Sequence, residues 1–283
     1  MLIIKSSIDL KNILKAKKKQ RKKLGLVPTM GSIHDGHLSL IKKAQENCDE
    51  VWVSIFINPT QFNDPKDFES YPKDFKSDIN KIQFISKNIN LFIPKSVHEI
   101  YHNDTSTDKF ELGFINKVLE GKYRPGHFEG VATIVNKLFK IFDPNIVFFG
   151  EKDFQQTMII RNLIDNFFPN IHLFICPTLR NKDGLALSSR NNLISQKSYG
   201  NCGIIFECLL YARENYLVTK YSDLIKIIKR KIELLDSFNL EYFEIRDEKT
   251  LKSFKQYEKG VCYRGFICVK VEGIRLIDNL LLS

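Results

Sequence analysis

Several common signatures are missing from this sequence of 283 residues. No two of its cysteines form a C-x-x-C pair, and no histidine cluster lies near them at the spacing of zinc ligands. Residues 1–10 lack the apolar centre of a signal peptide, and no apolar run is long enough to cross a bilayer. A G-x-G-x-x-G turn, the fingerprint of dinucleotide-binding folds, is also missing. We therefore expect a cytoplasmic protein that has no membrane partner and binds no metal through its own side chains. Reduced thiols in the core are expected for Cys48, Cys176, Cys202, Cys208, Cys262 and Cys268.

The composition is that of a globular protein with an excess of positive charge. Hydrophobic residues make up 43% of the chain and charged residues 27%, and the length allows one large domain or two smaller ones. The net charge of +10 would attract nucleic acid, anionic membranes or anionic metabolites. The densest basic run, Lys15 to Lys23, is better explained as a solvated helix face, so we expect no nucleic-acid partner. A basic nucleic-acid-binding protein remains an alternative, and it predicts binding that weakens steeply with salt.

The stretch LGLVPTMGSIHDGHLSLI is the most informative part of the sequence. Its first four residues, Leu24–Val27, predict a buried strand, and apolar residues at helical spacing follow the second histidine. Between them, Gly31 and Gly36 would let backbone N–H groups approach a ligand at the start of a helix. His34 and His37 are three residues apart, so both could donate to one phosphate group from the first helical turn. The alternative is an ordinary strand-turn-helix with exposed histidines, and the motif alone does not decide between the two.

Alternating strands and helices continue to about residue 178. Further strands are predicted at Val51–Ile57, Leu91–Ile93, Ile146–Phe149 and Leu173–Cys176. Helices are predicted at 7–19, at Asp74–Asn88, after His37, around Val131–Phe142, and after Asp153 with Ile159 and Leu163 on its core side, while 102–113 stays unassigned. From Ser195 onward, two helical stretches precede the short strands Tyr242–Ile245, Phe266–Val271 and Arg275–Ile277. The fold class is therefore α/β, with a Rossmann-like parallel sheet over 1–178 and a smaller α+β domain over 179–283.

Polar side chains follow two of the predicted strands, where open α/β sheets place their ligand crevice. Asn58 and Gln61 follow the second strand, and Gly150–Asp153 follows the fourth. From the residues alone, an Asx turn with a proline is the preferred explanation of the first of these. Arg124, in the loop EGKYRPGHFEG, could face an anion or simply be solvated. The loop DGLALSSRN could wrap phosphate oxygens or be a plain polar loop.

Five blocks of the sequence together resemble the pantothenate synthetase family. They are PTMGSIHDGH, FINPTQF, FGEKDFQQ, DGLALSSRN and IRLIDN, which span almost the whole chain in that family's order. The DGLALSSRN block also resembles the phosphate-binding loop that pairs with H-x-G-H in the nucleotidylyltransferase and class I aminoacyl-tRNA synthetase superfamily. This resemblance implies joining of pantoate to β-alanine with ATP, through a pantoyl-adenylate, with release of AMP and pyrophosphate. It also implies Mg²⁺ bound mainly through ATP phosphates, and a homodimer formed through the first domain.

The resemblance also implies roles for individual residues. The ATP site would contain Met30, Gly31, Ser32, Ile33, His34, Asp35, Gly36, His37, Gly150, Glu151, Lys152, Asp153, Leu179, Leu187, Ser188, Ser189 and Arg190. Within it, the catalytic residues would be His34, His37, Lys152 and Arg190. Pantoate and β-alanine would contact Gln61, Gln156, Asn58, Arg124 and His127.

Two positions depart from the family's pattern, and one alternative activity stays open. Lys73 stands where the family often has arginine, which puts any bidentate role for it in doubt, and Leu187 stands where methionine is common. The H-x-G-H motif also serves nucleotidyltransferases that move AMP to a phosphate acceptor. Such an acceptor would call for an extra cationic cluster, whereas the amides at the acceptor loop favour a carboxylic acid.

Overall fold

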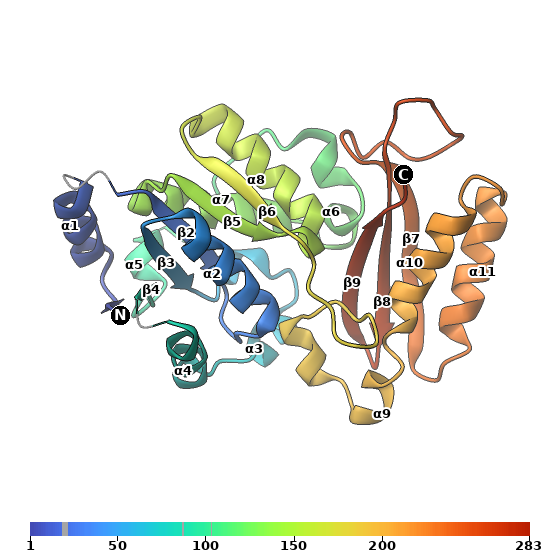
Figure 1. Cartoon of the computed structure of the whole chain (residues 1–283), viewed down its shortest axis with the longest axis horizontal. Helices are drawn as coiled ribbons and strands as arrows, with labels where there is room; N and C mark the ends of the chain where they lie inside the picture. The colour runs from blue at the N-terminus through green and yellow to red at the C-terminus, as the bar shows by residue number, and fades with distance from the viewer. Residues whose placement is uncertain (19–21, 87, 103) are drawn as a thin grey trace. The chain divides into compact units, whose positions relative to one another are not determined.

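The chain divides into two compact units in a computed structural model that describes residues 1–18, 22–86, 88–102 and 104–283 (Figure 1). The first unit is Met1–Pro177 and the second is Thr178–Ser283. The boundary lies one residue before the expected one. Part of the predicted basic run, residues 19–21, falls outside the described residues, as does residue 87 near the predicted end of the helix Asp74–Asn88.

The first unit is built on a parallel sheet, which confirms the predicted α/β class. Its described strands are β1 (Ile3–Ile4), β2 (Leu24–Thr29), β3 (Glu50–Ile55), β4 (Ile89–Phe92), β5 (Ile146–Gly150) and β6 (His172–Cys176). They lie in the order β1-β4-β3-β2-β5-β6, with every pairing parallel. The strands β2, β3 and β5 are therefore neighbours, and their carboxyl ends meet at one edge of the sheet.

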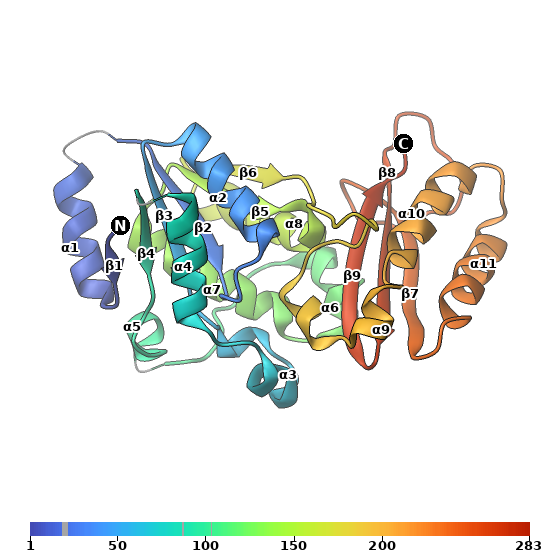
Figure 2. The same cartoon turned by 60° about the horizontal axis from the view of Figure 1, so that its bottom comes forward.

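Alternation along the strands gives the sheet two apolar faces. In β2, Leu26 joins one core cluster and Val27 the other, and in β3 Trp52 and Val53 divide in the same way. Successive strand side chains point to opposite faces, so each face needs its own cover of helices. One face carries α2 (Asp35–Asn47) and α4 (Phe75–Ile85), as Figure 2 shows. The other carries α1 (Ser7–Lys18), α7 (His127–Phe142) and α8 (Phe154–Phe167).

Several predicted boundaries are wrong. The strand expected to stop at Val27 continues through Pro28, which pairs with Ser54, because parallel pairing needs no N–H from every residue. The two-residue β1 was missed because so short a run shows no periodicity. Short helices that were not predicted are η1 (Pro59–Gln61), α3 (Pro65–Ser70), α5 (His98–Tyr101), η2 (Gly113–Lys117), α6 (Glu120–Tyr123) and η3 (Glu151–Asp153). The predicted EGKYRPGHFEG loop is thus partly helical.

The second unit is an antiparallel sheet packed against helices, as predicted. After η4 (Ser189–Leu193) come α9 (Gln196–Tyr199), α10 (Ile204–Asn215), α11 (Tyr221–Glu233), β7 (Phe238–Asp247), β8 (Tyr263–Val271) and β9 (Ile274–Leu281). Both sheet pairings are antiparallel, and α10 and α11 pack on the strands to form a separate core. The observed strands are longer than predicted.

All six cysteines are free, but only some lie in the core. Burial raises the pKa of the thiols of Cys176, Cys202 and Cys208 to about 11, which keeps them protonated at neutral pH. Cys262 is exposed and Cys48 is half-buried, so the prediction of a core position is wrong for these two. Within the described parts of the chain, no helix combines the length and the apolar character that a membrane crossing requires.

Candidate active site

The two histidines of the H-x-G-H motif lie side by side at the start of α2. His34 is the N-cap residue, and its Nδ1 accepts a hydrogen bond from the Gly36 N–H at 3.1 Å. His37 follows in the first helical turn, and the centroids of the two rings are 4.1 Å apart. The two rings therefore lie together as predicted, although His34 stands at the N-cap and not within the first turn.

Both histidines are held neutral near pH 7. Burial, followed by the nearby charge of Lys152, lowers the pKa of His34 to about 4. Burial and then the neighbouring His34 lower the pKa of His37 well below its ordinary value. Because Nδ1 of His34 accepts, its proton is assigned to Nε2, which leaves an N–H donor on the far side of the ring. Nδ1 of His37 is buried and has no partner among the described residues.

A cationic segment lies beside the two neutral histidines because β5 pairs directly with β2. Gly150 ends β5, and the 3₁₀ helix η3 that follows carries Lys152 and Asp153. Lys152 is only 17% exposed, and its Nζ lies 3.4 Å from the Asp153 carboxylate, which is 44% exposed. The charge of Lys152 acts on both histidines, so the two segments predicted to bind phosphate lie close together.

The glycine turn itself does not offer its N–H groups to a ligand as expected. The backbone N–H groups of Ser32 and Ile33 donate to the carboxylate of Asp78, at 2.9 and 2.7 Å. The Gly31 N–H donates to Thr29 Oγ1, and the Gly36 N–H to His34. The expectation is therefore wrong for these four groups, and phosphate would depend on side-chain donors and the helix dipole instead.

Gly31 is required by close packing and backbone conformation. Its φ is +82°, and an added Cβ would lie 2.9 Å from Oδ2 of Asp78 and 3.1 Å from the Ile55 side chain. Asp78 had no sequence signal, because an acidic residue on an amphipathic helix usually marks the solvated face. In the structure its side chain is only 1% exposed.

Asn58 uses its whole side-chain amide inside the protein. Its Oδ1 accepts from the Tyr101 hydroxyl at 2.6 Å and from Thr60 Oγ1 at 3.2 Å. Its Nδ2 donates to Gly130 O and to Oε1 of Gln61, at 3.1 and 3.2 Å. Asn58 is 1% exposed, so this geometry favours a role in orienting Gln61 over direct contact with substrate.

Arg124 and His127 hold the backbone of Gln61. Because arginine only donates, the 3.0 Å contact from Arg124 Nη1 assigns Nε2 of His127 as the acceptor. The proton is then on Nδ1, which donates to the Gln61 carbonyl at 2.8 Å. Arg124 also lies 3.7 Å from the Glu120 carboxylate and is only 13% exposed, so the alternative of a solvated loop arginine is wrong. The Gln61 amide contacts the sulfur of Met30, next to the glycine turn.

The adjacent glutamines of α8 differ in their surroundings. Gln155 is buried, donates to the carbonyls of Ile115 and Val118, and accepts from the Glu120 N–H. Among the described residues, Gln156 has no side-chain hydrogen-bond partner and is half-buried. Gln155 is therefore structural, whereas the amide of Gln156 is available to a ligand.

In the second unit, the DGLALSSRN loop is anchored at its base. Arg180 forms a paired contact with the Asp278 carboxylate, at 2.5 and 2.9 Å, and an isolated bridge joins it to Ala186. Asp278 belongs to the IRLIDN block, whose contribution to this loop the sequence did not indicate. Ser188 caps η4 by accepting from the Arg190 N–H at 3.3 Å. The predicted ATP contacts of Leu179, Leu187, Ser188, Ser189 and Arg190 stay predictions.

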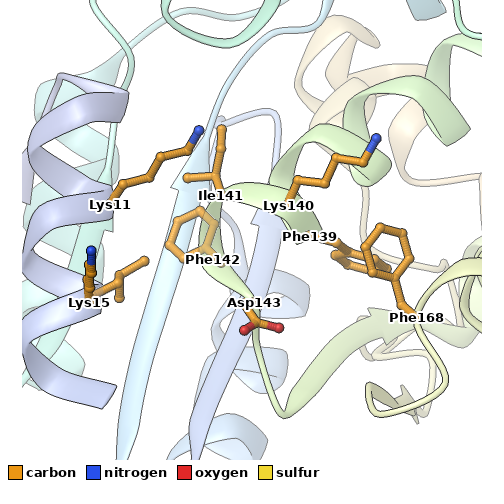
Figure 3. Close-up of a pocket in the computed structure, with 9 residues that line it drawn as sticks. Lys11, Lys15, Phe139, Lys140, Ile141, Phe142, Asp143 and Phe168 are labelled. Carbon is orange, nitrogen blue, oxygen red and sulfur yellow. The ribbon is translucent and has the colours of Figure 1, made fainter. Parts of the chain in front are cut away.

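A separate hollow of about 360 Å³ lies at the other end of the sheet (Figure 3). It is lined by α1, α7 and Asp143, which precedes the amino end of β5. Figure 3 shows Lys11, Lys15 and Lys140 around it, with Phe142 between them. None of the predicted site residues lines it. In the described residues, no three His, Cys, Asp or Glu side chains are grouped so that they could hold a metal ion.

Comparison with known proteins identifies the family. The model of the pantoate-beta-alanine ligase family matches residues 2–281. This chain is a member of that family. Pantothenate synthetase from Flavobacterium psychrophilum is 41% identical over 283 residues, covering 100% of both chains. The pantothenate synthetase from Thermotoga petrophila is 37% identical over 286 residues, again covering 100% of both.

Solved members of the pantoate-beta-alanine ligase family share the fold. Pantothenate synthetase from Thermus thermophilus superposes with a TM-score of 0.90 at 32% identity, covering 100% of both chains. The ligase from Francisella tularensis, complexed with beta-gamma ATP and beta-alanine, has a TM-score of 0.80 at 35% identity and covers 100% of this chain and 98% of its own. The recognition from five sequence blocks is thereby confirmed.

Proposed function

We propose that this chain is an ATP-dependent ligase that condenses pantoate with β-alanine through a pantoyl-adenylate, releasing AMP and pyrophosphate. The observation that carries the proposal is one donor-rich cluster beside the neutral amide of Gln61. His34, His37 and Lys152 form the cluster, and Gln61 reaches the same turn through Met30. Family membership supports the same reaction.

In the first step, a pantoate carboxylate oxygen attacks the α-phosphorus of ATP, and the bond from this phosphorus to the bridging oxygen of pyrophosphate breaks. The nucleophile is already ionised, so the step needs positioning and charge stabilisation but no general base. Neutral His34 and His37 would donate N–H bonds to phosphate oxygens, and Lys152 would balance the charge that moves onto pyrophosphate. The orphaned Nδ1 of His37 would gain a partner when substrate binds.

In the second step, the β-alanine amine attacks the acyl carbon, the bond to AMP breaks, and the amine loses a proton. The amides of Gln61 and Gln156 would hold pantoate, since an amide can donate to a carboxylate and accept from hydroxyls. Asn58, Arg124 and His127 would act by holding Gln61.

Mg²⁺ is proposed to bind through the ATP phosphates, whose oxygens are its preferred ligands. Asp153, with its half-exposed carboxylate at the site, is suited to ribose hydroxyls or to a water of such an ion. The homodimer implied by the resemblance also stays a prediction, and light scattering of the purified chain tests it.

The test is exchange of labelled pyrophosphate into ATP, measured with and without pantoate and without β-alanine. Reversible adenylation of pantoate predicts exchange only when pantoate is present. Equal exchange without pantoate would contradict the proposal and favour transfer of AMP to another acceptor.

A further inference from the structure

We propose that Asp78 and Lys81, both on α4, are positioning residues that hold the turn before His34 in the shape that binds ATP. The inference rests on the proposed function, because it concerns the nucleotide half of that site. Neither residue belongs to the five sequence blocks that carry the family resemblance, and neither is among the predicted site residues.

Side chains of α4 form hydrogen bonds with both the N–H groups and a carbonyl group of the turn. Asp78 accepts the N–H groups of Ser32 and Ile33, and Lys81 Nζ donates to the Ile33 carbonyl at 2.7 Å. Asp78 and Lys81 are three residues apart on one helix, so they share a face and reach the same segment. The peptide units directly before His34 are therefore fixed from α4.

The turn has a conformation that needs such support. Gly31 has a φ of +82°, and Ser32 follows with a φ of +52°, in the left-handed region that residues with a Cβ adopt at a cost. Two successive left-handed residues persist only when surrounding contacts hold them. Here the buried Asp78 carboxylate fills the concave side of the turn, which in many phosphate-binding loops holds the ligand itself.

The pair also adds to the electrostatics of the site. The charge of Lys81 contributes to the lowered pKa of both His34 and His37, which places its ammonium near both rings. Lys81 thus supplies positive potential where ATP phosphates are proposed to lie. The Asp78 carboxylate instead accepts hydrogen bonds from backbone N–H groups. Loss of either side chain should therefore affect ATP and leave pantoate alone.

Asp78→Asn and Lys81→Met test the proposal, with Asp74→Ala as the matched control. Asp74 caps the same helix by accepting from the Ser77 N–H and does not contact the turn, so its loss weakens α4 without releasing residues 31–33. We expect Asp78→Asn to weaken ATP binding about tenfold or more while changing pantoate binding less than about twofold, the loss expected for a charged hydrogen bond. Lys81 is exposed, so its variant should fold and show a smaller change of the same kind.

Hydrogen exchange at the Ser32 and Ile33 amides gives a readout that a general loss of stability would not produce. It should accelerate in both α4 variants and stay at the wild-type rate in Asp74→Ala. Equal weakening of ATP and pantoate, or unchanged ATP affinity with faster amide exchange, would overturn the positioning role. Pantoate-dependent exchange of pyrophosphate into ATP is measured first in the wild type. If pantoate does not stimulate this reaction, the proposed function is contradicted. The hydrogen-exchange rates of the Ser32 and Ile33 amides still test the contacts with α4 in that case.

Discussion

At the residue scale, Gln155 and Gln156 are neighbours with opposite roles. Gln156→Ala should weaken pantoate binding by about tenfold to a hundredfold, the cost of losing a hydrogen bond to a charged group, with little change in ATP affinity. Gln155→Ala should instead lower the free energy of unfolding by about 1–3 kcal/mol, because it leaves the carbonyls of Ile115 and Val118 without their donor. Separate titration of each ligand and urea unfolding of each variant measure these effects. Equal losses of pantoate and ATP in Gln156→Ala would make that residue structural.

Lys152 belongs to the first chemical step in this account. Lys152→Ala should slow pantoyl-adenylate formation by roughly 10²–10³-fold, the loss typical of removing one preorganised donor from a charged transition state. Amine attack should slow less, because pyrophosphate has left by then. Single-turnover measurements separate the two steps, and Lys140→Ala, in the remote hollow, is the matched control. A rate of adenylation within about threefold of wild type would remove Lys152 from the mechanism.

The buried state of His34 predicts a pH dependence of stability. Its pKa is about 4 in the folded chain and about 6.5 when unfolded, so the unfolded state binds more protons between these values. The contribution to folding is complete above pH 6.5 and is lost as the pH falls toward 4. His34→Asn keeps a good N-cap residue and should therefore show a smaller loss of unfolding free energy over this window. Urea unfolding at several pH values in this window measures the free energy of unfolding. If it falls equally steeply with pH in the wild type and in His34→Asn, His34 is not held in the neutral form by burial.

At the scale of elements, the DGLALSSRN loop combines a fixed base with polar side chains that are half-buried at Ser188 and Arg190 and buried at Ser189. Leu185 and Ala186 are buried, and an added Cβ at Gly184 would lie 2.8 Å from the Phe206 ring. We expect ATP to slow amide exchange at residues 186–191, because Ser188, Ser189 and Arg190 are suited to phosphate. Residues 257–260, in an exposed loop of the same unit, serve as the control segment. Protection that is the same with and without ATP would mean that the loop does not respond to nucleotide.

Sequence patterns predicted the elements that contain enough residues to show a period. The short continuous apolar run of β2 and the apolar stripe of α7 were sufficient to predict a parallel sheet and the helices that cover it. The strand β1 and the helix α6 were missed because two and four residues do not define a period. Tertiary contacts that support them, such as β1 pairing with β4, have no local signature.

Only part of the candidate site was predicted, because contacts between distant parts of the chain have no local signature. Motifs identified His34, His37 and Lys152, whose types and spacing indicate phosphate chemistry. They gave no hint of Asp78, whose partners lie more than forty positions away in the sequence. Nor did the motifs show that the side chain of Asn58 forms hydrogen bonds with Tyr101 and Gly130. An asparagine after a strand has the same local pattern whether it binds a ligand or supports the fold.

At the scale of the whole molecule, the central claim is that the carboxylate oxygen of pantoate becomes bonded to the α-phosphorus of ATP. The most direct measurement uses pantoate labelled with ¹⁸O in both carboxylate oxygens, followed by mass spectrometry of the nucleotide product. One labelled oxygen should appear in AMP, and the other should stay in the amide product. Unlabelled AMP, or label in inorganic phosphate or pyrophosphate, would contradict it.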